Sequence, residues 1–288
     1  MSLDARTAGI LFVVATPIGN PEDLSPRALR ILAEADRIAC EDTRRAGLML
    51  AAHAIRRPMI SYFEHNEERR TPEIVARLLA GETIALVTDA GTPAISDPGY
   101  RLVRAALDAG IRVSAVPGVS AVIAALSVAG IPTNRFAFEG FLPVKAGARG
   151  KHLESLAHEP RTLVFYEAGR RLGETLAAMA AALGAAREAA ILREITKTYE
   201  ETIRGSLGDL ARRFAATAAL GEVTIVVAGA ADDSAARIAS PVTLEMLLAE
   251  GVSLRQASAV IARLTGRSRR EIYQDAIKTR RAENKPCE

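Results

Sequence analysis

The chain has 288 residues, of which 49% are hydrophobic and 25% are charged, and its formal net charge is +3. This length and composition predict about two domains with a sizeable core and argue against an intrinsically disordered protein. The two isolated cysteines, Cys40 and Cys287, argue against a disulfide framework and suit a cytoplasmic protein, and we expect neither a signal peptide nor a membrane span.

The first half of the chain alternates short β-rich runs with helical patterns. Strands are expected at 10–15, 38–40, 59–62, 83–87 and 112–116. Helices are expected to begin with an N-cap residue followed by proline at Ser25-Pro26, Thr71-Pro72 and Asp97-Pro98. This order predicts a mostly parallel sheet, and such sheets bind ligands outside the carboxyl ends of their strands.

The alternation changes after about residue 118. Strands are expected at 136–139, 162–166, 190–194, 199–204 and 223–228, and helices at 119–130, 170–183 and 206–220. The adjacent runs within 190–204 predict a hairpin, so the second sheet is expected to be mixed. After a linker near 230–241, three short helices are expected at 243–250, 253–265 and 268–281.

The fold predicted from these patterns is α/β with two α/β domains and a small helical C-terminal segment. The domains are expected at 1–117 and 118–230, and the linker with its helical extension at 231–288. Residues 263–281 carry seven Lys or Arg against two acids. Such a basic segment is typical either of binding to a polyanion or of a solvated helix face.

Three turns rich in glycine and proline follow predicted strands of the first half, at residues 15–21, 88–99 and 116–121. Any single turn of this kind is explained by the needs of the backbone alone. Three of them at one edge of a sheet favour a rigid site for a flat polar heterocycle, with Asp89 as its polar anchor. The common dinucleotide and nucleoside-triphosphate motifs, GxGxxG and GxxxxGK[ST], are absent from the sequence.

Two charged clusters have both a structural and a functional interpretation. Glu41-Asp42-Thr43-Arg44-Arg45 follows the second strand and favours an N-cap at Asp42 or Thr43, with substrate binding as the alternative. Residues 193–201 alternate acids and bases, which is typical of a solvated edge strand and also of the wall of a polar cleft. His65 has no second ligand at metal-binding spacing, so no metal site is expected.

Nine motifs occur in a fixed order along the chain: ATPIGN, EDTRR, EHNE, DAGTPAISDPG, VPGVSA, FEGFLP, FYE, REITKTYEE and GRSRREIYQ. In them the chain resembles the tetrapyrrole methylase superfamily of S-adenosylmethionine-dependent enzymes, and within it the members that methylate small-subunit ribosomal RNA. The resemblance implies S-adenosyl-L-methionine bound in a cleft between two α/β domains, usually in a homodimer. It also implies methyl transfer to a cytidine 2′-hydroxyl of 16S rRNA in the small ribosomal subunit.

The resemblance also assigns residues. The cofactor-binding residues that it implies are Pro17, Ile18, Asp89, Ala90, Gly91, Thr92, Pro93, Ile95, Ser120, Ala121, Tyr166, Ala228 and Gly229. Because a ribose hydroxyl is a poor nucleophile while protonated, a nearby base is expected, and the catalytic candidates are Glu41, Asp42, Glu167 and Lys197. The candidates for RNA binding are Arg44, Arg45, Lys145, Arg170, Arg267, Arg269 and Arg270.

One motif departs from the superfamily pattern. After FYE the relatives usually carry Ser-Pro-His-Arg-Leu, whereas this chain carries Ala168-Gly169-Arg170-Arg171-Leu172. Arg170 supplies positive charge where the histidine would stand, but no neutral base. Two other functions remain open from the sequence. One is methylation of a tetrapyrrole such as a porphyrinogen or corrinoid precursor, and the other is non-catalytic RNA binding in ribosome assembly.

Overall fold

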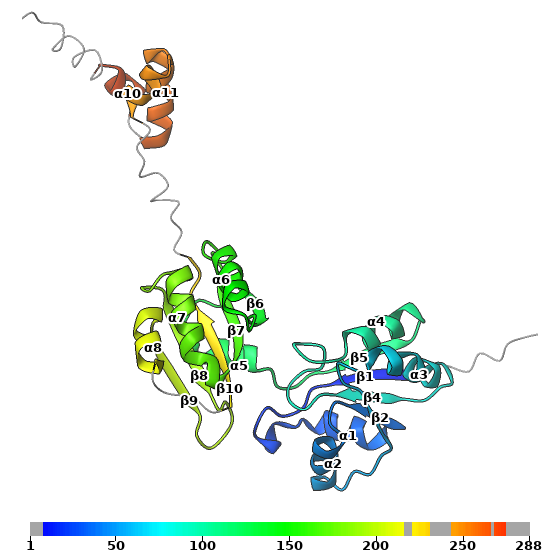
Figure 1. Ribbon diagram of the computed structural model, residues 1–288. Helices are drawn as coiled ribbons and strands as arrows, with labels where there is room; N and C mark the ends of the chain where they lie inside the picture. The colour runs from blue at the N-terminus through cyan, green and yellow to red at the C-terminus, as the bar shows by residue number, and fades with distance from the viewer. Residues whose placement is uncertain (1–7, 216–220, 231–242, 266–267, 275–288) are drawn as a thin grey trace, which may run out of the picture. The chain divides into compact units, whose positions relative to one another are not determined.

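The computed structural model describes residues 8–215, 221–230, 243–265 and 268–274. The chain divides into two compact units, Met1–Ala230 and Ala231–Glu288. The first unit contains two five-stranded sheets, one in the blue-to-cyan part of the chain and one in the green-to-yellow part (Figure 1). The expected division at residue 117 falls between the strands of these two sheets, and as a domain boundary it stays a prediction.

The first sheet is entirely parallel, as the alternating pattern predicts. Its strands are β1 (Ile10–Val14), β2 (Arg37–Cys40), β3 (Met59–Ser61), β4 (Ile84–Val87) and β5 (Arg112–Val116). They pair in the order β3-β2-β4-β1-β5. All four residues of β4 are buried, which is typical of a central parallel strand covered by helices on both faces. The carboxyl ends of β4, β1 and β5 therefore lie next to one another.

Helices cover both faces of this sheet. α1 (Pro26–Glu34) and α2 (Thr43–Ala52) pack on one face, and α3 (Glu67–Leu79) and α4 (Tyr100–Asp108) pack on the other. The N-cap expected at Ser25 is confirmed, because its side chain accepts a hydrogen bond from the Ala28 backbone N–H. Asp42 caps α2 in the same way through the Arg44 backbone N–H.

Two expected helix starts are wrong. α3 begins after Asn66, so Pro72 lies inside the helix and Thr71 is not its cap. The Asn66 side chain accepts from the Phe63 N–H and donates to the Ser61 carbonyl, and these bonds turn the chain into a helix earlier than the proline motif predicts. α4 begins after Gly99, whose φ of 139° favours glycine, so Asp97 is not the N-cap.

The second sheet is mixed, as expected. Its strands are β6 (Phe136–Phe141), β7 (Thr162–Ala168), β8 (Glu188–Arg193), β9 (Glu201–Ser206) and β10 (Glu222–Val227), in the order β6-β7-β10-β8-β9. Only β6 and β7 run parallel, and the predicted hairpin is the antiparallel pair of β8 and β9. β10, the last strand in the chain, therefore lies at the centre of its sheet.

The helices of this second sheet also lie on two faces. α5 (Ala121–Ala129) packs on one face, and α6 (Ala146–Ser155), α7 (Leu172–Leu183) and α8 (Leu207–Phe214) contribute to the core on the other. The sequence did not predict α6, because its two glycines and its charged residues give a weak apolar pattern, with only Arg149 and Leu153 buried. Residues 216–220, the end of the expected helix at 206–220, lie outside the described residues.

The second unit is helical over its described residues. α10 (Leu244–Ala249) and α11 (Leu254–Thr265) agree with two of the three expected helices, and residues 269–274 form part of the third. Ala257 and Ile272 are buried between these helical segments. In the described part of the chain, no helix has the length and hydropathy needed to cross a membrane.

Candidate functional site

Three loops meet at the carboxyl edge of the first sheet. Thr16, after β1, and Gly91, after β4, exchange two backbone hydrogen bonds of 2.8 and 3.0 Å. The Thr16 hydroxyl also donates to the Thr88 carbonyl at 3.1 Å. Thr92 donates from its hydroxyl to the carbonyl of Val119, after β5, at 3.2 Å. The three glycine- and proline-rich turns expected from the sequence are therefore tied to one another at adjacent strand ends.

These loops line a cavity of about 780 Å³ between the two sheets. The second sheet contributes Phe141 and Tyr166 from the ends of β6 and β7, and residues 221–224 from the start of β10. Small-molecule and cofactor sites commonly occupy cavities of roughly 300–1,000 Å³. The cavity therefore has the size and the position, at strand ends of an α/β sheet, of a ligand site.

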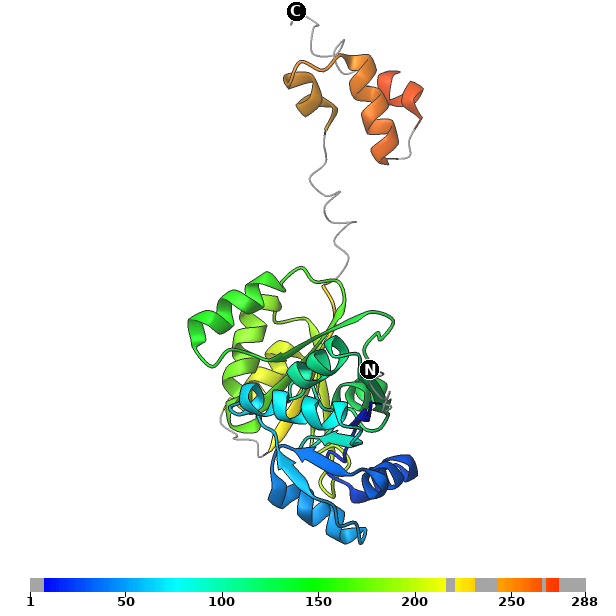
Figure 2. The ribbon, with the colours of Figure 1, turned by 90° about the vertical axis from the view of Figure 1, so that its right-hand side faces the viewer.

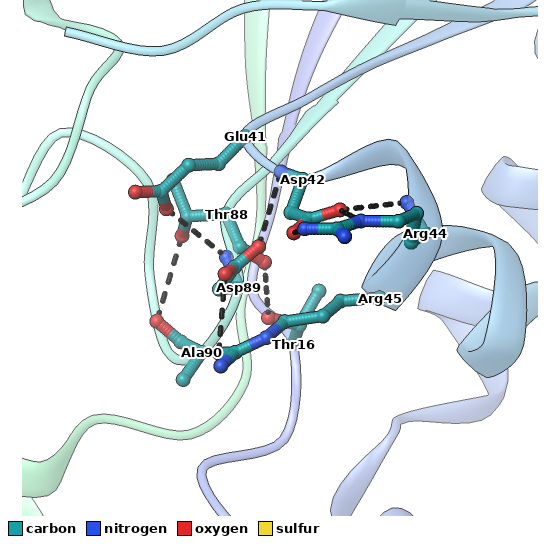
Figure 3. Close-up of polar contacts among 8 residues, drawn as sticks. All are labelled: Thr16, Glu41, Asp42, Arg44, Arg45, Thr88, Asp89 and Ala90. Atoms are coloured by element: carbon teal, nitrogen blue, oxygen red, sulfur yellow. Dashed lines mark hydrogen bonds and ion pairs between the residues drawn. The ribbon is translucent and has the colours of Figure 1, made fainter.

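Carboxylates and arginines form a network at these strand ends (Figure 3), and Glu41, Arg45 and Asp89 of this network line the cavity. Asp89 accepts the Asp42 backbone N–H at 3.2 Å and pairs with Arg45 at 3.2 Å. Glu41 accepts the Asp89 backbone N–H at 3.4 Å, which joins the loop after β2 to the loop after β4. Asp42 points to the other side and pairs with Arg44 at 2.9 Å.

The surroundings lower the pKa of Asp42 and raise the pKa of two other acids. The hydrogen bond from Arg44 lowers the pKa of Asp42 to about 2, so this carboxylate is held in its ionised form. Burial, more than the charge of neighbouring acids, raises the pKa of Glu41. Burial and then the charge of Glu41 raise the pKa of Asp97, a cavity residue, to about 6. Burial therefore makes Glu41 and Asp97 better proton acceptors than the same carboxylates would be in water.

Aromatic rings form part of the wall that the second sheet provides. The Tyr166 ring lies 4.9 Å from that of Phe138 and 5.6 Å from that of Phe141, measured between ring centroids. Burial raises the pKa of Tyr166, while a hydrogen bond with the Val122 backbone opposes that rise. Tyr166 is therefore fixed in place between β6 and the first turn of α5.

The loop between β8 and β9 reaches the first sheet (Figure 1, Figure 2). The Asn20 backbone N–H donates to the Thr196 hydroxyl at 3.1 Å, and Lys197 pairs with Glu194 at 3.1 Å. Glu194 and Thr196 both have positive φ, of 52° and 68°, which is strained for residues other than glycine. Gly19 leaves room for the lysine, because a Cβ there would lie 2.5 Å from its Cγ.

The structure brings most of the expected cofactor-binding residues to the cavity. Those that line it are Pro17, Ile18, Asp89, Ala90, Gly91, Thr92, Ile95, Ser120, Ala121 and Tyr166. Pro93 is buried and is not among the lining residues. Ala228 and Gly229 lie at the far end of β10, because this strand runs antiparallel to β7 and its carboxyl end points away from the cavity. Residues 221–224, at the other end of the strand, line the cavity instead.

Of the four catalytic candidates, two line the cavity and two do not. Glu41 and Lys197 line the cavity, whereas Asp42 caps α2 and is bound to Arg44. Glu167 is fully buried and accepts hydrogen bonds from the Thr175 hydroxyl at 2.5 Å and from the Ala168 N–H at 2.8 Å. Successive residues of a strand point to opposite faces, so Glu167 points toward α7 while Tyr166 points into the cavity.

Asp97 is a cavity residue that the sequence pattern does not reveal. Its place before Pro98 predicts a helix cap. Instead, the chain turns at Ala94 and Ser96, whose φ values are 70° and 60°, and α4 starts only after Gly99. An aspartate inside a loop already predicted to bind a ligand was the signal that could have identified it.

The RNA-binding candidates are mostly solvent-exposed. Arg44, Arg45, Lys145 and Arg170 are exposed in the first unit, and Arg269 and Arg270 in the second, while Arg267 lies outside the described residues. Arg45 also belongs to the cavity. Among the described residues, no group of three or more His, Cys, Asp or Glu side chains could hold a metal ion.

Comparisons with known proteins agree with this geometry. The family described as "Tetrapyrrole (Corrin/Porphyrin) Methylases" matches residues 11–211, and the family described as "RsmI C-terminal HTH domain" matches residues 242–280. The chain is 49% identical to "Ribosomal RNA small subunit methyltransferase I" of Xylella fastidiosa, over 93% of this chain and 98% of that protein. It is 44% identical to the protein of the same name from Mycobacterium tuberculosis, over 98% and 99% of the two chains.

Among solved structures, the fold is similar to uroporphyrin-III C-methyl transferase of Thermus thermophilus in complex with S-adenyl homocysteine. The TM-score is 0.53 at 21% identity, over 77% of this chain and 97% of that one. At this identity the likeness concerns the fold. The family match over residues 11–211 and the relatives identical at 44–49% decide the assignment. On this evidence the chain belongs to the tetrapyrrole methylase family.

Proposed function

We propose that the protein is an S-adenosylmethionine-dependent methyltransferase of small-subunit ribosomal RNA, and that the methyl group goes to the 2′-hydroxyl of a cytidine in 16S rRNA. The observation that carries the proposal is the cavity bounded by three tied loops of the first sheet and by the second sheet. The full-length similarity to small-subunit rRNA methyltransferases supports the choice of substrate.

The residues of the cavity fit S-adenosylmethionine. Among the described residues, the backbone N–H groups of Ala90 and Thr92 have no acceptor in the protein, so they are available to a polar ligand. Ser120 and Ala121 begin α5 without a side-chain cap, and a helix N-terminus binds a carboxylate such as that of the methionine moiety. Asp89 provides a carboxylate for the amino or hydroxyl groups of the cofactor.

S-adenosylmethionine, when bound, supplies a methyl group on a sulfonium, which is activated for in-line displacement. The contribution of the protein is to hold the reacting hydroxyl in line, and such positioning is worth up to about 7–11 kcal/mol in well-oriented systems. Glu41 and Asp97 are the acids whose raised pKa suits them to accept the hydroxyl proton. Asp42 and Glu167 are less suited, because Arg44 holds the first and the second is buried outside the cavity.

Basic residues of both units are proposed to hold the RNA backbone. Arg44 and Arg170 are exposed in the first unit, and Arg269 and Arg270 in the second. The match of residues 242–280 to a helix-turn-helix family supports nucleic-acid binding by the second unit. We also propose a homodimer that acts in the cytoplasm, where small ribosomal subunits are found. Light scattering of the purified protein tests the dimer.

The decisive experiment offers labelled S-adenosylmethionine together with small ribosomal subunits, naked 16S rRNA or a porphyrinogen, in separate reactions. We expect label in the RNA, at a nucleotide that resists alkaline hydrolysis because its 2′-hydroxyl is methylated. Label in the porphyrinogen alone would assign the protein to tetrapyrrole methylation. Binding of RNA without label, by a protein that takes up the cofactor in calorimetry, would assign it a non-catalytic role.

A further inference from the structure

Helix α2 has an apolar face that its packing on the sheet uses only in part, since Met49 of this face also packs against the core. Its buried residues are Ala46 and Leu50, which contribute to the core of the first sheet. A different set lines the cavity, spaced as one face of a helix: Arg45, Leu48, Met49, Ala52 and His53. The side of a surface helix that faces away from the core is normally polar. Leu48 is nevertheless 75% exposed, so this apolar face has a ligand-sized space in front of it.

Cations accompany this apolar face. Arg45 projects from α2 itself, and Lys197 is contributed to the same cavity by the loop between β8 and β9. Asp89 and Glu194 pair with these two side chains at 3.2 and 3.1 Å, so both cations are already directed into the cavity region. The Arg45 side chain is 71% exposed and that of Lys197 is 42% exposed, so both cations keep surface that a phosphate oxygen can reach beside the partner carboxylate.

We infer that the α2 face is the subsite that receives the base of one unpaired nucleotide of RNA, with the adjoining phosphates at Arg45 and Lys197. This inference rests on the proposed function. Enzymes that act on an extruded nucleotide hold its base between aromatic or apolar side chains, and cations beside such a pocket hold the adjoining phosphates. A base in a duplex cannot enter a cavity between two sheets, so the nucleotide must be unstacked and turned out of its helix.

The position of this subsite also fits the reaction. α2 starts directly after Glu41 and Asp42, so a base on the α2 face lies near Glu41, one of the proposed proton acceptors. A nucleotide whose base lies on Leu48 and Met49 places its ribose between that face and the loops proposed for the cofactor. Carboxylates such as Glu41 also accept hydrogen bonds from the amino group of cytosine.

The test compares Leu48→Ser with Leu107→Ser as a matched control. Leu107 is an exposed leucine of α4, 54% accessible, and it does not line the cavity. We expect Leu48→Ser to raise the KM for small ribosomal subunits about tenfold, with kcat changed by less than about twofold. The lost contact is present both in the substrate complex and in the transition state, so its removal weakens binding without slowing the chemical step. Leu107→Ser is expected to keep the KM of the wild type, whereas Leu48→Met, which retains an apolar side chain of another shape, is expected to raise the KM less than Leu48→Ser does.

Two further measurements distinguish a base subsite from a cofactor contact and from a contact between copies of the chain. The affinity for S-adenosylmethionine, from calorimetry, is expected to be the same in all four proteins. If Leu48→Ser and Leu107→Ser have equal KM values while the wild type methylates the RNA, the inference is wrong and the proposed function stands. A lower mass of Leu48→Ser in light scattering, with its KM unchanged, would assign the face to a contact between copies. A wild type that labels no RNA would overturn both proposals.

Discussion

Replacing Asp97 with asparagine is expected to stabilise the protein at neutral pH. Burial, followed by the charge of Glu41, raises the pKa of Asp97 from 3.8 to about 6 in the folded state. The folded protein therefore binds this proton more tightly than the unfolded chain, and it loses stability as the pH rises from about 4 through about 6. At about 1.4 kcal/mol for each pKa unit, the ionised carboxylate costs about 3 kcal/mol near pH 7 but only about 0.5 kcal/mol near pH 4.

Urea unfolding followed by circular dichroism at about pH 4 and about pH 7 measures this difference. The amide resembles the protonated acid in shape, so Asp97→Asn is expected to gain about 3 kcal/mol in unfolding free energy at the higher pH and little at the lower. Asp108→Asn is the control, because Asp108 forms an exposed pair with Arg104 and contributes less than about 1 kcal/mol. An equal gain for Asp97→Asn at both pH values would refute the reasoning.

Four further variants test other parts of the structure. In Gly229→Ala the new Cβ would lie 2.0 Å from a backbone carbonyl oxygen, so a loss of at least about 2 kcal/mol in thermal unfolding is expected, whereas Gly150→Ala, with open space in a helix, should gain up to about 1 kcal/mol. Arg171→Ala leaves a buried carboxylate of β7 without its ion pair, and a loss of about 3 kcal/mol is expected in urea unfolding. Gly19→Ala places a Cβ 2.5 Å from the Lys197 Cγ, so the lysine and its loop must shift; we expect methyl transfer to fall at least about tenfold and the melting temperature to fall by less than in Gly229→Ala, where the clash is with backbone. Unchanged values in these assays would contradict the contacts on which each expectation rests.

Local patterns predicted the first sheet well because each of its strands has a simple cause. Continuous apolar runs such as β4 occur where helices cover both faces, and Ser25 and Asp42 cap helices through short-range hydrogen bonds. The errors came from contacts that no local pattern contains. α3 starts early because Asn66 bonds back to the end of β3, and this pairing depends on how the strand end is placed.

The site was predicted in part for the same reason. Rigid turns at strand ends identify a ligand edge, and the cavity includes most of the residues expected from them. The resemblance implied that the carboxyl end of β10, with Gly229, binds the cofactor, whereas the amino end of this antiparallel strand lines the cavity. Tyr166 and Glu167 are successive residues of β7 and cannot both point into the cavity. Once Tyr166 is placed there, Glu167 is excluded as a catalytic residue.

The place of β10 in its sheet has a consequence for biosynthesis. This strand is the last of the first unit to be made, yet it lies between β7 and β8, and its first residues belong to the cavity wall. A nascent chain that ends before residue 222 therefore contains two strands with their shared neighbour missing. An amino-terminal fragment that ends before residue 222 therefore cannot form the complete cavity, although it contains all five strands of the parallel sheet. During synthesis the binding site can be completed only after β10 has been made.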